Sequence, residues 1–292
     1  MPTLPRKLSR EEILRRLWNE VKRGRAIIIS SAGDGFFAKL MDAAEIDIIG
    51  VYNSGYGRHL GIGSLSGLLP IFDTNRLVME MGAEIIPRVK NSVIIAGVCA
   101  QDPKTIWPVY LRNLTEMGFH GIMNFPTVGL IDKDSLFRRN LEESGFGYDR
   151  EVEVIKLARE MDIFTIAYCF TPDEVEKMAK AGADVIAVHV GLTTGGLIGA
   201  KTTVSIEEAI ERTNKLLSAA YKVRPEGDFI PITHGGPMGD PESLQKVLDK
   251  TQAVGFVSGS AIERTPVEPF LIDVCKKFKS VKVKPPEKMK IP

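Results

Sequence analysis

The chain has 292 residues, of which 44% are hydrophobic and 26% are charged, an ordinary composition for a globular protein. Its formal net charge of +1 gives no reason to expect nucleic acid as a partner. The three cysteines are far apart and lack a zinc-binding spacing, which favours a reducing compartment. No apolar run approaches the ~20 residues of a membrane span, and no secretory signal is recognised. We therefore expect a cytoplasmic protein with neither a membrane nor a nucleic-acid partner.

The first predicted element is an amphipathic helix from Ser9 to Lys22. Ser9 and Glu12 have the spacing of a capping box, and apolar residues recur at helical intervals from Ile13 onward. We expect this helix, within a segment 1–24, to plug or flank the amino-terminal face of the fold. At the other end lysines recur, and residues 279–292 are expected to be a basic, flexible tail.

Between these ends, short apolar runs alternate with amphipathic stretches. Strands are predicted at 26–30, 46–52, 93–98, 121–125, 164–168, 185–189, 229–234 and 255–258. Helices are predicted at 36–44, 75–86, 105–117, 151–161, 172–181, 206–221, 241–251 and 267–278. Strands that are apolar on both faces belong to a parallel sheet covered by helices. The order predicts an α/β protein, a (β/α)8 TIM barrel with an extra N-terminal helix, as one domain over residues 1–292.

Two connections attract attention as irregular segments. Residues 52–59 read as a glycine-rich loop, in which His59 could belong to a mobile lid. Residues 125–151 form the longest irregular stretch, long enough to be a functional lid rather than a plain connection.

In a TIM barrel the chemistry lies where the strands end, so the residues at those ends are candidates. His189 and His234 close the sixth and seventh predicted strands, and each precedes a glycine-rich turn. A neutral imidazole there can be a general base, an oxyanion donor or a metal ligand, whereas a buried, hydrogen-bonded ring would be structural. Two such residues on one face favour catalysis, and Asn124 and Tyr168 at neighbouring strand ends would orient the ligand.

Glycine- and hydroxyl-rich turns on the same face could bind an anion through backbone N–H groups, with Arg264 adding charge. The alternative is that each glycine only makes a tight turn, and that Cys99 is an inert filler rather than a nucleophile. The predicted ligand-binding residues are Asn53, Ser54, Gly55, Cys99, Thr193, Thr194, Gly195, Gly196, Gly235, Gly236, Ser258, Gly259 and Ser260.

Four longer motifs carry a family resemblance: NFPTVGLID at 124–132, RNLEESGFGY at 139–148, VGLTTGGLIGAK at 190–201 and HGGP at 234–237. They closely resemble the phosphoenolpyruvate hydrolase-like family, whose members are also labelled TIM-barrel signal transduction proteins and include the carboxyl-terminal barrel of a plant tobamovirus-resistance protein. The resemblance runs from about Ile13 to Phe278. It implies a barrel akin to the phosphoenolpyruvate/pyruvate-binding superfamily of phosphonopyruvate hydrolase, phosphoenolpyruvate mutase and isocitrate lyase, which bind 2-oxo acids through Mg²⁺.

The resemblance also assigns roles to residues. It implies that the YNSGY segment at 52–56 grips substrate, that Mg²⁺ is the candidate cofactor, and that Asp73 and Asp102 are its candidate ligands. The chain departs from the superfamily where Cys99-Ala-Gln-Asp102 replaces an acidic metal motif and where Asn124 replaces a glutamate.

Two functions follow as hypotheses. The first is an enzyme that acts on a small anionic 2-oxo or enol-phosphate acid by hydrolysis or by C–C or P–C cleavage. The second, which the lost acidic residues motivate, is a non-catalytic signal-transduction or interaction barrel that binds a metabolite or nucleotide. By family analogy we also expect a homo-oligomer, with the first and eighth helices as candidate interface elements.

Overall fold

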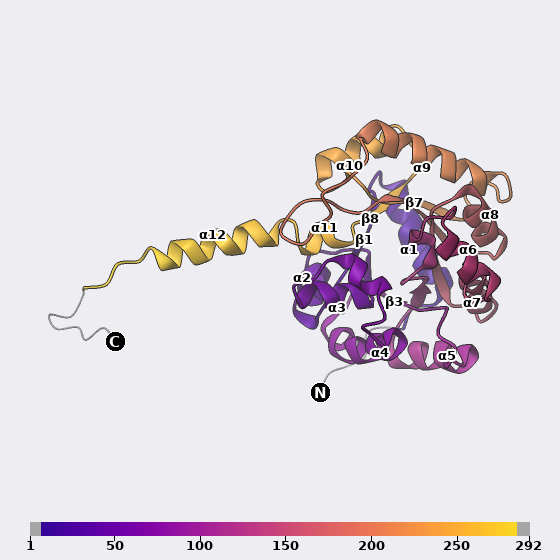
Figure 1. Ribbon diagram of the computed structural model, residues 1–292, viewed down its shortest axis with the longest axis horizontal. Helices are drawn as coiled ribbons and strands as arrows, with labels where there is room; N and C mark the ends of the chain where they lie inside the picture. The colour runs from indigo at the N-terminus through magenta and orange to yellow at the C-terminus, as the bar shows by residue number, and fades with distance from the viewer. Residues whose placement is uncertain (1–6, 285–292) are drawn as a thin grey trace.

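The computed structural model describes residues 7–284, which form a closed parallel barrel with strands in the order β1 to β8 (Figure 1). The strands are β1 Ile27–Ser31, β2 Ile48–Val51, β3 Val93–Gly97, β4 Gly121–Met123, β5 Phe164–Cys169, β6 Val185–Gly191, β7 Ile230–Gly235 and β8 Gly255–Val257. Each strand pairs in parallel with the next, and β8 closes the ring against β1. The predicted (β/α)8 barrel is confirmed.

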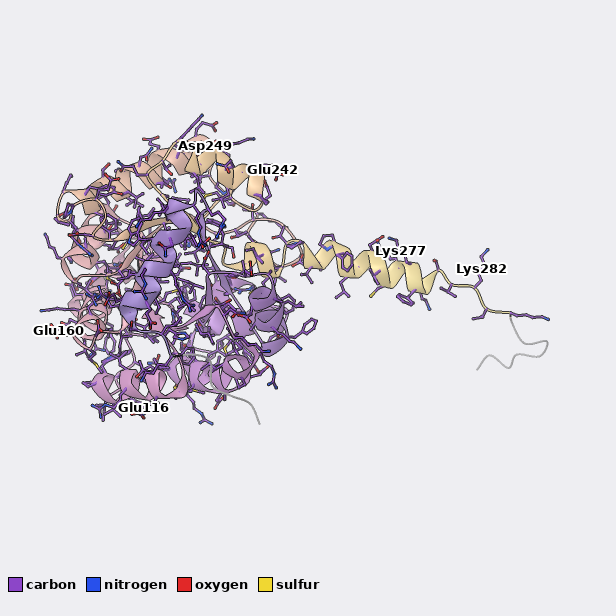
Figure 2. The ribbon with its side chains drawn as sticks, turned by 180° about the vertical axis from the view of Figure 1, so that it is seen from behind. Glu116, Glu160, Glu242, Asp249, Lys277 and Lys282 are labelled. Atoms are coloured by element: carbon purple, nitrogen blue, oxygen red, sulfur yellow. The ribbon has the colours of Figure 1, made fainter. Side chains whose placement is uncertain are left out.

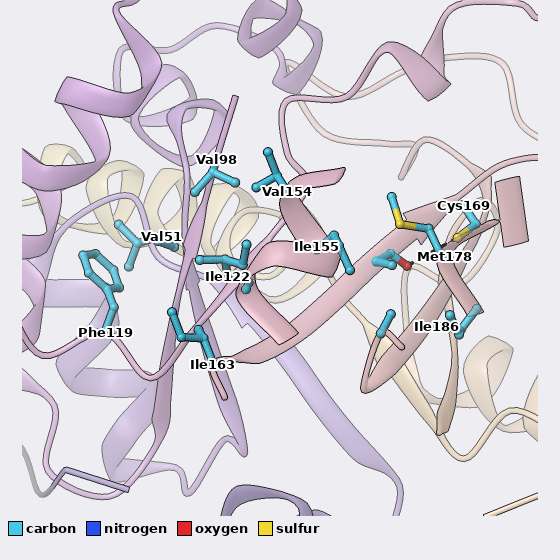
Figure 3. Packing of buried hydrophobic residues seen from close by; sticks show 14 of the residues in the cluster. Val51, Val98, Phe119, Ile122, Val154, Ile155, Ile163, Cys169, Met178 and Ile186 are labelled. Atoms are coloured by element: carbon cyan, nitrogen blue, oxygen red, sulfur yellow. Dashed lines mark hydrogen bonds between the residues drawn. The ribbon is translucent and has the colours of Figure 1, made fainter. Parts of the chain in front are cut away.

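Helices surround the barrel and follow the strands as predicted, with ends that differ by a few residues (Figure 1). They are α2 Gly35–Ala43, α4 Thr74–Ile85, α5 Trp107–Met117, α7 Asp149–Glu160, α8 Pro172–Lys180, α9 Ile206–Tyr221, α10 Pro241–Leu248 and α12 Val267–Lys279. The main hydrophobic core lies between the strands and this ring, and its cluster includes Val51 of β2, Ile122 of β4 and Ile155 of α7 (Figure 3). Charged side chains such as Glu160 and Glu116 lie on the outside of the ring (Figure 2).

A second core fills the barrel interior, and α1 (Arg10–Lys22) closes it. The N-cap Ser9 forms the predicted capping box with Glu12. Ile13 and Leu17 are buried in the same cluster as inward-facing strand residues such as Phe164 at the start of β5. The helix therefore plugs the end of the barrel at which the strands begin, as expected, and leaves the opposite end for a site.

The segment expected to be a glycine-rich loop is a helix, α3 (Asn53–His59), followed by the short 3₁₀ helix η1 (Ser64–Leu68). Glycine lowers helix propensity, which is why the sequence reads as a loop. Tertiary packing overrides this preference because the glycines permit close approach. A Cβ on Gly57 would lie 2.6 Å from Oγ of Ser66, and a Cβ on Gly55 would lie 3.2 Å from the carbonyl oxygen of Ala32.

The stretch 125–151 is also more ordered than expected. It contains the 3₁₀ helix η3 (Val128–Leu130) and the helix α6 (Leu136–Glu143). Buried Arg138 of α6 donates to Glu142 at 2.7 Å and to Glu174 of α8 at 2.8 Å. The ion pair with Glu174 fastens α6 to the outer ring. The prediction that this stretch is irregular is wrong, because it contains two helical elements.

The last described helix, α12, projects away from the barrel (Figure 1). None of its residues is buried, and Phe270 is 71% exposed. Lys277 lies on this helix and Lys282 beyond it (Figure 2). Of the tail predicted at 279–292, Lys279 is the last residue of α12, residues 280–284 have neither helix nor strand, and residues 285–292 lie outside the described part. Within residues 7–284, no helix has both the length and the apolar character that a membrane crossing needs.

Candidate functional site

A cavity of about 190 Å³ opens at the end of the barrel where the strands finish. Its walls come from the ends of several strands, from α3 and from the loops after β6 and β8. The lining residues are Tyr52, Ser54, Arg58, Gly63, Ser64, Leu65, Phe125, Leu130, Tyr168, His189, Leu192, Thr193, Ile198, Gly199, Ala200, His234, Gly259, Ser260 and Arg264.

The two histidines lie side by side in this cavity because the barrel register pairs them. His189 of β6 is the register partner of His234 of β7, and neighbouring residues in register point to the same side of a sheet. Their ring centroids are 4.4 Å apart. Tyr168 of β5 joins them, with its ring centroid 5.0 Å from that of His234.

Backbone contacts give the two imidazoles opposite tautomers. Nδ1 of His234 lies 2.5 Å from the carbonyl oxygen of Val257, which can only accept, so in the neutral ring Nδ1 carries the proton and Nε2 is an acceptor. Nδ1 of His189 accepts from the N–H of Gly191 at 3.3 Å, so the proton of that ring is on Nε2. The pair therefore offers one proton acceptor and one proton donor.

Burial keeps both rings neutral. It lowers the pKa of His234 to about 4, against the opposing effect of the hydrogen bond to Val257. Burial, together with the neighbouring His234, holds the pKa of His189 well below its ordinary value. Burial also raises the pKa of the Tyr52 and Tyr168 hydroxyls, which therefore stay protonated at neutral pH. These four side chains contribute hydrogen-bonding groups to the cavity without a net charge.

Of the two arginines that line the cavity, Arg58 is neutralised by a partner. Its Nη2 lies 2.5 Å from Oε2 of Glu263, and both side chains are buried. Glu263 also accepts from the N–H of Gly33 at 2.6 Å, and its Oε1 lies 3.0 Å from Nε2 of His59. These hydrogen bonds with Glu263, together with the nearby Asp34 carboxylate, raise the pKa of His59. The network ties α3 to the loop after β1 and to the short helix α11 (Ser260–Glu263) that follows β8.

Arg264 is bound differently. One guanidinium nitrogen, Nη1, donates to the carbonyl oxygen of Gly195 and lies 3.3 Å from Oε1 of Glu268. The other, Nη2, is buried and has no hydrogen-bond partner within residues 7–284, and the same holds for Oγ of Ser54. Across the same residues, no aspartate or glutamate lines the cavity. An arginine donor and a hydroxyl without acceptors suit the oxygen atoms of an anion.

Asn124 lies outside the cavity lining, although the sequence suggests direct contact with the ligand. Its Nδ2 donates to Oε2 of Glu151 at 2.6 Å and to the carbonyl oxygen of Tyr168 at 3.1 Å, and its Oδ1 accepts from the N–H of Tyr168 at 2.6 Å. With both amide atoms engaged, Asn124 positions Tyr168. Sequence reasoning missed the buried Glu151, because its partners come from two separate segments, Gln101 after β3 and residues 124–128 after β4.

Asn53 and Cys99 likewise lie behind the lining. Asn53 donates to the carbonyl oxygen of Gly67 at 2.8 Å and to Oγ1 of Thr74 at 2.9 Å. Burial raises the pKa of Cys99 to about 11, so its thiol is protonated at neutral pH and poorly suited to act as a nucleophile.

The predicted anion-binding turns divide into two groups. Ser54, Thr193, Gly259 and Ser260 line the cavity, whereas Gly55, Thr194, Gly195, Gly196, Gly235, Gly236 and Ser258 do not. The N–H of Gly236 donates to the carbonyl oxygen of Gly191 at 2.9 Å, so it is not free for an anion. The hydroxyl of Ser258 donates to that of Ser30 at 3.1 Å. These turns hold neighbouring loops together.

The two predicted metal ligands, Asp73 and Asp102, lie outside the cavity lining. Oδ2 of Asp102 accepts from Oγ1 of Thr105 at 2.5 Å, and its Oδ1 accepts from the N–H of Lys104 at 2.9 Å. Asp73 precedes α4 at the N-cap position, outside the cavity lining. Within the described residues no group of three or more histidine, cysteine, aspartate or glutamate side chains could hold a metal ion. Mg²⁺ prefers carboxylate oxygens, so a lining of arginines and histidines does not fit it.

Sequence reasoning places Arg58 at the end of the second strand without giving it a role, and gives Arg264 only a supporting role. Ser54 and Arg58 are four residues apart and share one helix face, a signal that appears only when 53–59 is recognised as a helix.

Comparison with known proteins identifies relatives of this chain. The sequence model of the family described as phosphoenolpyruvate hydrolase-like matches residues 12–281. The ToMV resistance protein Tm-1(GCR237) of Solanum lycopersicum is 45% identical over 274 residues, which cover 94% of this chain and 36% of that protein. The ToMV susceptible protein tm-1(GCR26) of the same plant is 46% identical over 270 residues, which cover 92% of this chain and 35% of that protein. The chain therefore spans little more than a third of these curated relatives.

Solved structures show the same fold at low sequence identity. Phosphoenolpyruvate phosphomutase from Streptomyces platensis subsp. rosaceus superimposes with a TM-score of 0.59 at 13% identity, over 94% of this chain and 87% of that chain. A phosphonopyruvate hydrolase in complex with oxalate and Mg²⁺ superimposes with a TM-score of 0.54 at 16% identity, over 92% of this chain and 85% of that chain.

Proposed function

This chain belongs to the phosphoenolpyruvate hydrolase-like family, and on that premise we propose that it is an enzyme acting on a small anionic acid. The substrate class is a 2-oxo or enol-phosphate acid, and the reaction is a hydrolysis or a C–C or P–C cleavage. The barrel neighbours named for phosphoenolpyruvate and phosphonopyruvate chemistry have the same fold, which motivates this class without fixing it.

The observation that carries the proposal is the complementary histidine pair. Nε2 of His234 can take a proton from water or from a substrate hydroxyl, while Nε2–H of His189 can donate to an oxygen on which negative charge develops. Both groups line one cavity, so a ligand that contacts both rings meets an acid and a base together. Tyr168, held by Asn124, adds a neutral hydroxyl on the same wall.

The size and charge of the cavity support a small acid. Its volume of about 190 Å³ lies below the roughly 300–1,000 Å³ of pockets for drug-sized ligands. A three- or four-carbon acid suits such a volume better than a whole nucleotide does. The guanidinium of Arg264, whose Nη2 has no partner among residues 7–284, supplies the positive charge that an acid needs.

A thermal-shift screen followed by product analysis tests the proposal. Phosphoenolpyruvate, phosphonopyruvate, oxaloacetate, other 2-oxo acids and nucleotides would each be added with and without Mg²⁺. At a ligand concentration near 100 times Kd, the stabilisation should be about 2.7 kcal/mol, which raises the unfolding midpoint measurably. Binding and turnover of an acid support the enzyme. Absence of turnover for every acid that binds contradicts it.

The second candidate function is a ligand-sensing barrel without turnover. Its specific support is that a relative which shares 45% identity is named a resistance protein rather than an enzyme. Tight binding of a metabolite with no product over long incubation would favour this function. We also propose that the Mg²⁺ arm of the screen shows no difference, because the cavity lining lacks carboxylates.

A further inference from the structure

The cavity has a roof made by the loop of residues 192–201, here called the roof loop, which joins β6 to α9. Leu192, Thr193, Ile198, Gly199 and Ala200 of this loop line the cavity. The loop reaches the segment after α3 on the other side, where a Cβ on Gly63 would lie 3.0 Å from the carbonyl oxygen of Ile198. A ligand inside the barrel mouth would therefore be covered by the roof loop.

Arg264 and Glu268 bind the backbone of the roof loop. Nη1 of Arg264 donates to the carbonyl oxygen of Gly195, and Oε2 of Glu268 accepts from the N–H of Leu197 at 2.6 Å. The contact is close, since a Cβ on Gly196 would lie 2.1 Å from Nη1 of Arg264 and 2.2 Å from Oε2 of Glu268. Gly195 and Gly196 have φ of 86° and 69°, which glycine adopts without strain. The loop thus lies directly on this ion pair.

The other terminal nitrogen of Arg264, Nη2, lies against Gly199 of the same loop. Nη2 is buried without a partner among the described residues, and a Cβ on Gly199, a lining residue, would lie 2.7 Å from it. Arg58 offers no such donor, because Nε and Nη2 are bound to Glu263 and Nη1 donates to Ser64. Only 6% of Arg264 is exposed, so an acceptor for Nη2 has to come from within the cavity.

We propose that Arg264 couples anion binding to closure of the roof loop. Nη2 binds a carboxylate or phosphate oxygen of the ligand, with Oγ of Ser54 as a second donor, while Nη1 keeps its hold on Gly195. Because a guanidinium is planar and rigid, fixing one edge by the ligand orients the other edge toward the loop. The inference rests on the proposed function only in taking a small anion as ligand, and it applies equally to a barrel that senses the anion without turnover.

Binding and loop order are measured separately to test this coupling. Oxalate and inorganic phosphate are titrated into the full chain by calorimetry, and hydrogen exchange of residues 192–201 is followed with and without each anion. We expect at least one anion to bind the wild type and to slow exchange of the roof loop. Arg264→Gln should raise Kd at least tenfold and abolish the ligand-induced protection.

Two further variants serve as controls for this test. Arg264→Lys retains the charge but has a single nitrogen, so it should recover part of the affinity without restoring protection of the loop. Arg76→Gln is the matched control, since Arg76 lies on the outer face of α4 beside Glu80, and it should behave like the wild type. If Arg264→Gln does not fold, Arg264→Lys and Ser54→Ala carry the comparison.

The outcomes separate this inference from the proposed function. Binding of oxalate alone identifies a carboxylate site, and binding of phosphate alone identifies a phosphate site. Unchanged affinity or unchanged loop protection in the Arg264 variants overturns the coupling, as does failure of both anions to bind the wild type. Anion binding with loop closure but no turnover of any acid overturns only the enzymatic proposal.

Discussion

At the scale of single residues, two side chains of one type acquire different chemistry from their backbone neighbours. Val257 offers His234 an acceptor, whereas Gly191 offers His189 a donor, and the two rings become base and acid. Nothing in either local sequence distinguishes them, because each closes an apolar run before a glycine turn. The difference arises from β8 for one ring and from the β6 bulge for the other.

The histidine pair predicts a specific kinetic response. His234→Asn places an amide donor near the position of Nδ1 but removes the acceptor at Nε2, so we expect kcat to fall by about 10²- to 10⁴-fold with the fold intact. His189→Asn should have a comparable effect through loss of the donor. Because the pKa of His234 is about 4, the activity of the wild type should stay level as pH falls from 8 to 6. A loss of activity centred near pH 6.5 in rate measurements would contradict this assignment.

Glu151 and His234 predict opposite contributions of pH to stability. Burial raises the pKa of Glu151 to about 7 from 4.5, so the folded state binds this proton more tightly, and stability falls as pH rises from 4.5 to 7. The pKa of His234 is lowered from 6.5 to about 4, so the unfolded state binds that proton more tightly, and stability falls as pH drops through this window. Each contribution is about 3 kcal/mol at its limit.

Single variants should expose each contribution in turn. Relative to wild type, Glu151→Gln should lose stability as pH drops from 6.5 to 4.5, and His234→Asn should lose stability as pH rises from 4.5 to 7. Urea unfolding at several pH values measures both. Parallel pH curves for the wild type and Glu151→Gln would show that Glu151 titrates normally.

At the scale of elements, the turns after the sixth and seventh strands are locked by backbone proximity. A Cβ on Gly235 would lie 1.9 Å from the carbonyl oxygen of Gly191, and Gly236 donates to that same oxygen. The glycines that look like anion-binding turns in the sequence instead let two adjacent loops meet. Close packing also explains why α3 is a helix in spite of its glycines, since its contacts with η1 and with the loop after β1 outweigh low helix propensity.

A pair of alanine substitutions separates the two roles of glycine. Gly235 and Gly227 both have positive φ, of 78° and 89°, but a Cβ on Gly227 meets nothing within 4 Å. Gly227→Ala should cost about 1–2 kcal/mol of unfolding free energy for the left-handed backbone alone. Gly235→Ala should cost clearly more, because the clash with Gly191 is added. Equal costs in denaturant unfolding would mean that the loops relax freely.

At the scale of the whole molecule, the two candidate interface helices differ. The apolar side of α1 is used inside the barrel, where Ile13 and Leu17 are buried. By contrast α12 leaves the ring, with Phe270, Leu271 and Phe278 at 71%, 57% and 77% exposure. Apolar side chains gathered on a projecting helix are typical of an interaction surface.

We therefore expect a homo-oligomer in which α12 packs against another copy. Phe270→Asp combined with Phe278→Asp should shift the mass in sedimentation or light scattering toward the monomer, because burial of the two rings is lost. Lys282→Glu, which changes charge beyond the helix, is the control. A wild type that sediments as a monomer at micromolar concentration would refute the expectation.

The sequence alone determines the barrel, the plugging helix and the face that carries the site. The periodicity of apolar residues that marks strands and helices is a local property of the sequence. Eight alternating strand–helix units of this length have few possible topologies, and the closed barrel is one of them. It also determines that His189, His234 and Tyr168 share that face, because they stand at strand ends. The sequence also determines the family, because the long family motifs are contiguous in the chain.

Only the tertiary structure decides which of these residues meet a ligand. Asn124 and Asn53 turn their amides toward protein partners, whereas Arg264, which lines the cavity, keeps a buried guanidinium nitrogen without a partner among residues 7–284. The protonation of Glu151 depends on groups such as Asn124, 27 residues away, and the tautomer of His234 depends on Val257, 23 residues away. The tautomer of His189 depends on Gly191, at the register shift between β6 and β7. Hydrogen bonds and desolvation act through space, so a pattern along the chain cannot specify them.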